Sequence, residues 1–355
     1  MQRTGVIVLA AIAVLIGMLT GASALLTPYV FPRKPDRAAG PLEVAVHELS
    51  LPDPRGAEYP PIAVRVWAPQ ARGGARPYPL IIYVPGWGGS RSGNDVLLSD
   101  IASEGFVVAA ADDVSRDQPD PAADPADEAV RRGAFRAFSP QDLAAFPDMS
   151  ERRTRLGYDK LARLVEALTR LPDKAIPSTI DLSRIGVVGF SFGGAVAAVT
   201  LARDPRVTAA VNLDGWVVDT PAASGVSRPL LALYARFNLH PWPAWWSAPV
   251  YYETQLARED FRALLGLSRS SAAEVRLIDG AEHDDFTDAR YAASHWKRWR
   301  PWRRKVIRSD RMRTIVEAYL IPFLLRHVSG HPLTAPDYPV FSEVTSIETI
   351  ESDLR

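Results

Sequence analysis

The chain contains no cysteine. This absence excludes disulfide bonds, thiolate metal sites, a cysteine nucleophile and a lipidated N-terminal cysteine. The formal net charge is zero and 47% of the residues are hydrophobic, so the composition indicates neither a disordered chain nor a general polyanion-binding protein. Internal repeats are also absent. A length of 355 residues therefore suits one large domain with insertions, and two ordinary domains are the alternative.

The N-terminal run over residues 5–26 carries no charged side chain and follows Arg3. It includes the small residues Ala22-Ser23-Ala24, which are typical of a signal-peptidase site. Residues 1–27 therefore predict an export signal, but the run is also long enough to cross a bilayer as an uncleaved anchor. We expect an extracytoplasmic protein, either secreted or periplasmic, or one anchored to a membrane by this segment. Residues 28–41, rich in proline and arginine, predict a linker.

Residues 42–330 alternate strand and helix patterns, which predicts an α/β fold with a mostly parallel sheet and helices on both faces. Two stretches, at about 113–149 and 236–272, predict insertions over the active site, and residues 331–355 predict a tail. Alternating residues predict edge strands at 42–51 and 62–67, and continuous apolar runs predict buried strands at 80–84, 106–111, 207–213, 230–235 and 275–278. Helices are expected at 94–104, 150–171 and 309–328.

Gly189-Phe190-Ser191-Phe192-Gly193 lies between a short apolar strand and a helix rich in small residues. This is the pattern of a nucleophile elbow, with Ser191 at the apex of a sharp turn. A Cβ at position 189 or 193 would strike the neighbouring strand or helix. The amide of Phe192 lies at a helix start, where unpaired donors favour an anion. The alternative is a plain glycine-rich turn.

A serine hydroxyl needs an imidazole to accept its proton and a carboxylate to orient that imidazole. His283 follows a short strand and precedes the closing helix, which favours it over the other histidines as the base. No acid follows the strand at 230–235, so Asp214, at the end of the preceding strand, is the expected carboxylate. The alternative is that Asp214 only caps the turn before Gly215. Weaker candidates are Asp219, Asp284 and Asp285.

The loop Pro85-Gly86-Trp87-Gly88-Gly89 follows a predicted central strand. Glycines let the backbone turn its amides toward a substrate oxygen, so the amide of Trp87 is expected to join that of Phe192 in an oxyanion hole. A flexible glycine-rich turn is the alternative. The loop lacks both G-x-G-x-x-G spacing and a P-loop lysine, which argues against nucleotide binding.

Three motifs resemble the platelet-activating-factor acetylhydrolase branch of the α/β-hydrolase superfamily. They are the elbow at 189–194, Leu213-Asp214-Gly215-Trp216, and the histidine loop at 280–288. The resemblance implies an α/β-hydrolase fold and hydrolysis of short or oxidised acyl chains from phospholipid-like esters, without a metal or other cofactor. Trp87, Trp216 and Phe286 are the substrate-binding residues that it suggests. Pro85 departs from the histidine that many members carry at that position.

Two aromatic stretches lie outside these motifs. Residues 237–252 combine tryptophan and tyrosine with proline, which indicates either a lid or acyl-pocket wall, or the packing of an irregular insertion. Residues 297–313 interleave tryptophan with lysine and arginine, which indicates either a lipid-docking surface or a solvated basic face. No recognition fold for nucleic acid accompanies this basic stretch.

The sequence therefore predicts a serine carboxylic-ester hydrolase that acts through an acyl-enzyme on a small-molecule or lipid ester. The alternatives are a broad-specificity carboxylesterase, or a hydrolase-like domain that serves as a non-catalytic membrane-binding or interaction module. We predict a catalytic triad of Ser191, Asp214 and His283, with a membrane surface as a further partner.

Overall fold

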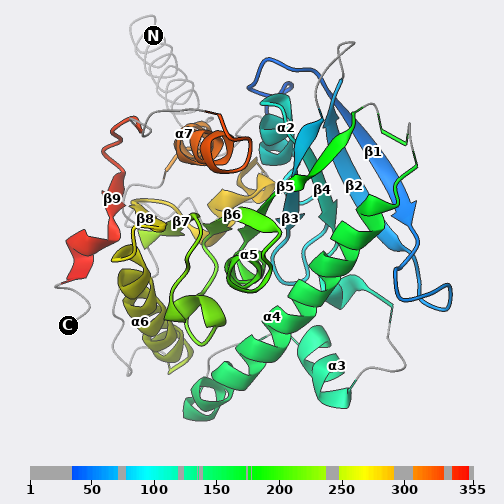
Figure 1. Cartoon of the computed structure of the whole chain (residues 1–355). Coiled ribbons are helices and arrows are strands. Elements are labelled where there is room, and N and C mark those ends of the chain that lie inside the picture. The colour runs from blue at the N-terminus through cyan, green and yellow to red at the C-terminus, as the bar shows by residue number, and fades with distance from the viewer. Residues whose placement is uncertain are drawn as a thin grey trace, which may run out of the picture.

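One mixed β-sheet with helices on both faces forms the body of the protein (Figure 1). The computed structural model describes residues 34–70, 77–118, 124–133, 135, 139–172, 175–176, 178–236, 248–291, 307–331 and 338–351. The sequence-based expectation of an α/β-hydrolase fold with a mostly parallel sheet is confirmed.

The sheet of the described residues has nine strands in the order β1-β2-β4-β3-β5-β6-β7-β8-β9. Strands β3 to β8 run parallel, whereas β1, β2 and β9 pair antiparallel at the two edges. The strands are β1 (Val44–Leu51), β2 (Ile62–Pro69), β3 (Tyr78–Val84), β4 (Val107–Ala111), β5 (Ile180–Phe190), β6 (Val207–Leu213), β7 (Leu230–Ala235), β8 (Ala273–Ile278) and β9 (Val344–Ser346). The parallel arrangement brings the carboxyl ends of β5, β6 and β8 to one rim, where such sheets carry their sites.

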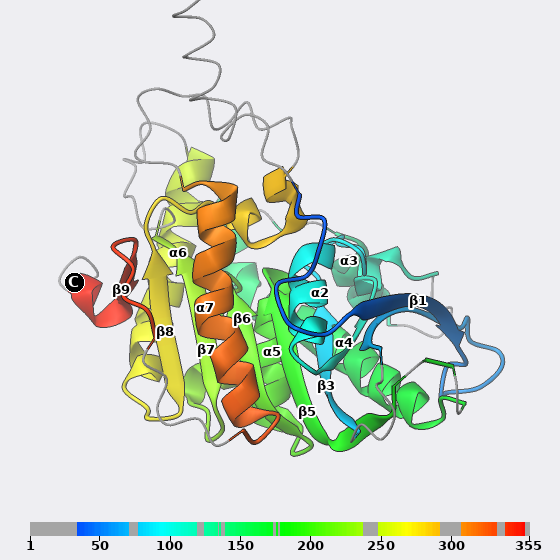
Figure 2. The same ribbon diagram turned by 90° about the horizontal axis from the view of Figure 1, so that it is seen from above.

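Helices α2 and α7 cover one face of the sheet, and α4, α5 and α6 cover the other (Figures 1 and 2). The α-helices are α2 (Asp95–Ser103), α3 (Pro125–Arg132), α4 (Pro140–Thr169), α5 (Phe192–Arg203), α6 (Ala248–Ser268) and α7 (Ser309–His327). Short 3-10 helices are η1 (Val114–Arg116), η2 (Pro221–Ser224), η4 (His283–Phe286), η5 (Asp288–Tyr291) and η7 (Ile347–Ile350). Each face of the sheet therefore has its own hydrophobic core.

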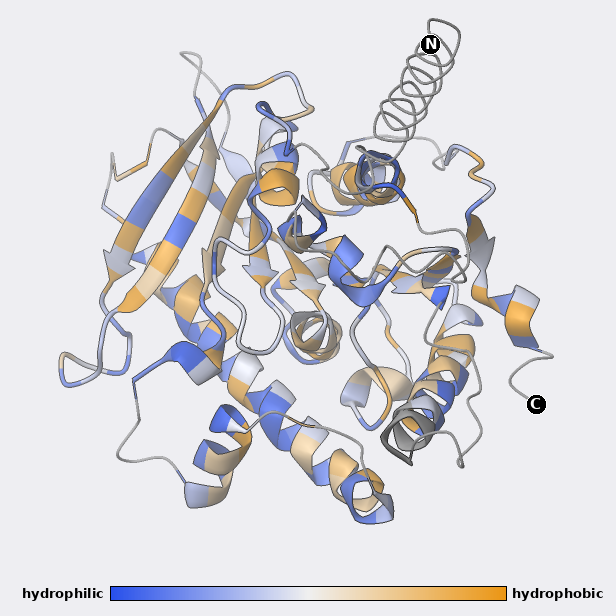
Figure 3. Ribbon diagram, turned by 180° about the vertical axis from the view of Figure 1, so that it is seen from behind, coloured by the Kyte–Doolittle hydropathy of each residue, from blue (hydrophilic) through white to orange (hydrophobic). Residues whose placement is uncertain are grey.

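Burial follows the apolar pattern of the strands. All five residues of β4 are buried, as expected for a strand covered on both faces. β1 alternates between less and more exposed positions, and Figure 3 shows the corresponding alternation of hydropathy along the edge strands. The predicted central strands are confirmed and β1 is an edge strand, whereas β2, also predicted as an edge strand, is paired on both sides by β1 and β4.

Helix α4 begins ten residues before the predicted start at Ser150, with Ser139 as its N-cap. The prediction was wrong because the proline-rich composition around Pro147 indicated an irregular segment. Phe146 is buried, and its ring packs against that of Trp216, with 5.8 Å between the ring centroids. This tertiary contact stabilises helical structure on both sides of the proline, although proline cannot donate a backbone hydrogen bond.

Both ends of the described chain pack against the domain. Residues 34–41, within the expected linker, lie along α2: the amide of Ala39 donates to the Asp100 carboxylate at 2.9 Å and that of Gly40 donates to Ser103 Oγ at 2.9 Å. At the other end, β9 and η7, within the expected tail, add the last strand to the sheet beside β8. Residues 34–41 and 338–351, which lie outside the expected bounds of 42–330, therefore pack against the sheet and α2.

The expected export signal or anchor at residues 1–27 lies outside the described residues. In the part of the chain that the structure describes, no helix has the length and hydrophobicity needed to cross a membrane.

Candidate active site

Ser191 lies in the sharp turn between β5 and α5. Its backbone has φ of 55° and ψ of −124°, in a region that non-glycine residues rarely adopt. The amide of Ser191 donates to the carbonyl of Leu213 at 2.8 Å, which ties the turn to β6. A Cβ at Gly189 would lie 1.9 Å from the carbonyl oxygen of Gly193, and a Cβ at Gly193 would lie 1.9 Å from that of Val84. Glycine is therefore required on both sides of Ser191.

Asp214 follows β6 directly and holds its carboxylate inside the protein. Its side chain is 1% exposed, and its φ of 56° turns the chain away from the strand. One carboxylate oxygen accepts the amide of Ala235, at the end of β7, at 2.9 Å. The other lies 2.6 Å from Nδ1 of His283. The acid therefore lies beside the end of β7, where the chain itself carries Arg236 and no carboxylate.

His283 opens η4, just after β8. Its Nε2 lies 2.8 Å from Oγ of Ser191, so the imidazole lies between the hydroxyl and the Asp214 carboxylate. The turn is held by Asn94, whose side-chain amide donates to the carbonyl of Phe286 at 3.0 Å. The structure thus brings together the three side chains that the sequence indicated as a triad.

The charge of Asp214 governs the protonation of His283. Burial of the imidazole opposes its charged form, but the hydrogen bond and negative charge of Asp214 outweigh this effect and raise the pKa of His283 above its usual value of 6.5. Asp214 also fixes the ring orientation through Nδ1, which leaves Nε2 directed at Ser191. This arrangement suits a base that accepts a proton and then holds it.

The loop after β3 lies against the elbow. A Cβ at Gly86 would come within 3.2 Å of the Cβ of Ser191, so the backbone of the loop approaches the serine closely. Neither the amide of Trp87 nor that of Phe192 has a hydrogen-bond acceptor among the described residues. Two backbone donors beside a serine hydroxyl are the groups that could hold a developing oxyanion.

Aromatic rings surround Phe192, the residue after the serine. Its ring centroid lies 6.0 Å from that of Trp87 and 6.0 Å from that of Trp216. Trp216 is half-buried and donates from Nε1 to Ser150 Oγ at 2.8 Å, which fixes the indole. The expected substrate-binding residues Trp87 and Trp216 therefore flank the elbow.

Phe286, the third expected substrate-binding residue, lies elsewhere. Its side chain is 0% exposed and belongs to the hydrophobic core on the α7 side of the sheet. A side chain packed there cannot line an open substrate site, so the structure corrects this expectation. Phe286 instead anchors the turn that carries His283, because the aromatic side chain is buried and its carbonyl binds Asn94.

Two residues at the site escaped the sequence analysis. The ring of Phe190 lies 4.7 Å from the imidazole of His283 between centroids, so the residue before Ser191 packs against that imidazole. Asn94 reaches the histidine turn across 192 residues of sequence. The position of Phe190 within the elbow could have indicated its role, whereas nothing in the local sequence distinguishes Asn94 from an ordinary helix cap.

Other expectations for this region lie largely outside the described residues. They concern the aromatic stretch at 237–252, of which the structure describes only the backbone from Ala248, and most of the basic stretch at 297–313. Among the described residues no group of histidine, aspartate and glutamate side chains could hold a metal ion.

Comparison with known proteins agrees with this architecture. Residues 62–237 match the model of the dienelactone hydrolase family, a range that includes Ser191 and Asp214 but ends before His283. A solved ferulic acid esterase from Streptomyces cinnamoneus superposes with a TM-score of 0.61, covering 88% of this chain and 98% of that one at 23% identity. The chain therefore has an α/β-hydrolase fold, and residues 62–237 are similar to the dienelactone hydrolase family.

The sequence is also similar to the platelet-activating factor acetylhydrolases, which confirms the resemblance that the motifs indicated. The chain is 25% identical over 181 residues to the protein of this name from Cavia porcellus and 26% identical over 194 residues to that from Bos taurus. These alignments cover 45% and 49% of this chain but only 40% and 44% of the relatives. The chain thus matches less than half of the length of either relative.

Proposed function

We propose that the protein is a serine carboxylic-ester hydrolase that works through an acyl-enzyme on Ser191. The observation that carries the proposal is the continuous hydrogen-bonded path from Ser191 Oγ through His283 to Asp214, with links of 2.8 and 2.6 Å. Nucleophile, base and orienting acid are the groups that acyl transfer needs, and they lie at the carboxyl rim of a parallel sheet.

In the first half-reaction, Ser191 Oγ attacks the ester carbonyl carbon while Nε2 of His283 takes the hydroxyl proton. The carbonyl oxygen becomes an oxyanion, which accepts hydrogen bonds from the amides of Trp87 and Phe192. His283 then gives its proton to the departing alkoxide, so the alcohol leaves and an ester to Ser191 remains. Asp214 stabilises the imidazolium throughout and stays ionised.

In the second half-reaction, water takes the place of the alcohol. His283 accepts a proton from the water, whose oxygen attacks the carbonyl carbon of the acyl-enzyme. The second oxyanion accepts hydrogen bonds from the same two amides. Collapse returns the proton from His283 to Ser191 Oγ and releases the carboxylic acid. Both halves use the same base in the same position, which is why one imidazole is sufficient.

The substrate class that we propose is a lipid-like or short-acyl ester. The similarity to platelet-activating factor acetylhydrolases favours it, and the half-buried rings of Trp87 and Trp216, which pack on the buried ring of Phe192, provide apolar surface for an acyl chain. A broad-specificity carboxylesterase is the second candidate, favoured by the ferulic acid esterase neighbour. The two are distinguished by substrate length and by lipid.

The first test is labelling with a fluorophosphonate probe, which reacts with an activated serine. We expect stoichiometric labelling of Ser191 in the wild type and none in Ser191→Ala. Folded wild-type protein that does not label would favour the non-catalytic alternative. A substrate panel of short-chain aryl esters and oxidised phospholipids, with and without vesicles, then separates the lipid esterase from the general carboxylesterase.

We also propose that the N-terminal segment holds the active-site rim near a membrane. Lys34 Nζ pairs with Asp288 at 2.9 Å, and Asp288 follows His283 in the same loop. Only residues 27–33 separate Lys34 from the hydrophobic run, and so short a chain spans at most about 29 Å. A membrane-embedded run would therefore keep the rim close to the bilayer.

The absence of cysteine allows a direct test of this orientation with the full chain in vesicles. We would attach a fluorophore to Ala289→Cys, an exposed position in the histidine loop, or to Ser271→Cys, an exposed position before β8 at the opposite end of the sheet. Quenchers on the lipid headgroups should quench the label at 289 more strongly. Equal quenching, or a mature chain that lacks residues 1–27 by mass spectrometry, would contradict the proposal.

A further inference from the structure

An ion pair is buried beneath the two loops that carry the oxyanion amides. Nη2 of Arg153, on α4, donates to both carboxylate oxygens of Asp113 at 2.8 and 2.6 Å. The side chains are 0% and 1% exposed, and neither residue is part of the motifs described above. A buried pair of this kind pays a large desolvation cost and is weak evidence for a stabilising role. Its position next to the site therefore calls for another explanation.

Asp113 holds the loop that carries Trp87. The amide of Gly88 donates to Oδ2 of Asp113 at 2.8 Å, and the amide of Asp113 donates to the carbonyl of Gly89 at 3.0 Å. Gly88 has a φ of 70°, a conformation that favours glycine. The first hydrogen bond holds the peptide that follows Trp87 and the second holds the peptide after Gly89, so Asp113 restrains the loop backbone directly after the Trp87 amide.

Arg153 contacts the other half of the site as well. Its guanidinium carbon lies 4.4 Å from the ring centroid of Trp87 and 4.0 Å from that of Phe192. These distances are within the range of cation–π contacts, which strengthen when the cation is removed from water. One guanidinium therefore packs on the side chains of both residues whose amides face the oxyanion.

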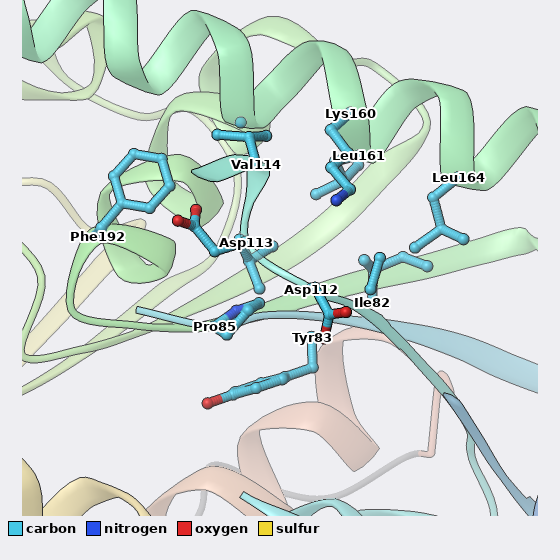
Figure 4. A pocket seen from close by; sticks show the side chains of 13 residues that line it. Ile82, Tyr83, Pro85, Asp112, Asp113, Val114, Lys160, Leu161, Leu164 and Phe192 are labelled. Carbon is cyan, nitrogen blue, oxygen red and sulfur yellow. The ribbon is translucent and has the colours of Figure 1, made fainter. Parts of the chain in front are cut away.

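Close packing alone does not fix this region. A cavity of about 30 Å³ lies between α4 and the sheet, lined by Asp113, Gly157, Lys160 and Phe192 among others (Figure 4). Nε and Nη1 of Arg153 have no acceptor among the described residues, and burial lowers the pKa of this guanidinium. Beside this cavity, Asp113 is held by the ion pair and by the hydroxyl of Ser115, which donates to its carboxylate at 2.5 Å, and Phe192 is held in part by the guanidinium on its ring.

We propose that Asp113 and Arg153 are positioning residues that set the spacing and direction of the Trp87 and Phe192 amides. The carboxylate fixes the loop after β3, and the guanidinium couples that loop to the start of α5. This inference rests on the proposed ester-hydrolase function. Because the oxyanion forms only during the reaction, the pair should affect the transition state more than substrate binding.

The test compares Arg153→Met and Asp113→Asn with the wild type on a soluble short-chain aryl ester. Asp113→Asn is close in shape and keeps an acceptor for the Gly88 amide, which guards against a simple failure to fold, but it removes the charge that holds the Arg153 guanidinium between the two halves of the site. We expect kcat to fall by about 10²-fold, the scale of one lost oxyanion donor, with KM changed by less than about 3-fold. Affinity for a trifluoromethyl ketone, which forms a tetrahedral adduct on serine, should fall in parallel with kcat.

Two controls separate positioning from stability. Arg155→Met removes an arginine of the same helix that pairs with Asp127 in a more exposed position, and it should leave kcat unchanged. Arg153→Lys keeps the positive charge and should recover part of the lost kcat. Because paired residues act together, the double variant Asp113→Asn/Arg153→Met should lose less than the product of the single losses.

The inference is overturned if folded Asp113→Asn and Arg153→Met retain wild-type kcat and inhibitor affinity, or if Arg155→Met loses as much. Failure of the proposed function looks different. In that case the wild type itself would neither label with fluorophosphonate nor turn over any ester, so the variants could not be compared by kcat.

Discussion

Nδ1 of His283 lies 2.6 Å from Oδ2 of Asp214, although 69 residues separate them in the chain. Asp214 ends β6, and its second oxygen accepts the amide of Ala235 at the end of the neighbouring strand β7. Because neighbouring parallel strands end at the same rim, a carboxylate from either strand end can reach the imidazole. An acid that follows β6 can therefore hold the histidine in the same geometry as an acid that follows β7.

Ester hydrolysis should increase with pH through the pKa of His283. The imidazole accepts the serine proton only when it is neutral, and Asp214 raises the pKa of His283 above 6.5, so activity is lost as pH falls below that raised value. The measurement is kcat/KM for a soluble aryl ester between about pH 5 and pH 9. A midpoint below 6.5 would contradict the assignment.

Asp214→Asn should lower kcat by roughly 10⁴-fold, because the amide does not hold the imidazole in the required tautomer. It should also move the acid limb of the pH profile to lower pH, since the charge that raises the pKa of His283 is lost. Asp219→Asn, at an exposed position after the same strand, is the control. If both variants lost activity equally, Asp214 would not be the orienting acid.

Gly193→Ala should destabilise the fold by about 3 kcal/mol or more, because the new methyl group would lie 1.9 Å from a backbone carbonyl that cannot easily move. Gly266→Ala is the matched substitution in α6, where a Cβ meets nothing within 4 Å. That change should stabilise the helix by about 0.5–1 kcal/mol. Urea unfolding of the two variants tests this contrast, and equal effects would speak against the tight turn.

Asp260→Asn should change the pH dependence of stability. Burial raises the pKa of Asp260 to about 7, although the amides of Val217 and Val218 donate to its carboxylate and lower the pKa in part. Between the unfolded value near 3.8 and about 7, the folded state holds more protons, so the contribution of Asp260 to stability falls as pH rises through this range.

Asparagine keeps an acceptor for these amides and has no charge to bury. The melting temperature of Asp260→Asn relative to wild type should therefore increase from pH 5 to pH 8. A difference that is independent of pH, or one that shrinks as pH rises, would indicate that Asp260 is ionised in the folded protein throughout this range.

Local sequence was sufficient for the strand, turn and helix around Ser191. The structure explains why glycine flanks the serine on both sides, because a Cβ at either position would overlap a backbone carbonyl. The start of α4 could not be predicted in the same way. A proline-rich composition favours irregular structure, and only the packing of Phe146 against Trp216 shows why helix extends through Pro147.

The roles of Phe286 and Arg153 illustrate the same difference. A motif indicates that an aromatic residue follows the histidine, but burial in the α7 core decides that Phe286 packs inward. Arg153 is one of many arginines in the sequence, and its neighbour Arg152 pairs with Asp148 at the surface. Only the way in which α4 crosses beneath the loop that carries Trp87 distinguishes Arg153 from Arg152.

The sequence by itself determined the buried central strands, the serine at the elbow, and the acid and histidine that follow strands, because apolar periodicity and glycine sterics act over a few residues. The tertiary structure alone decided which distant groups meet: His283 with Asp214, Asn94 with Phe286, and Arg153 with Asp113. Such contacts depend on how helices cross the sheet and how loops pack at its rim, and no local pattern encodes those distances.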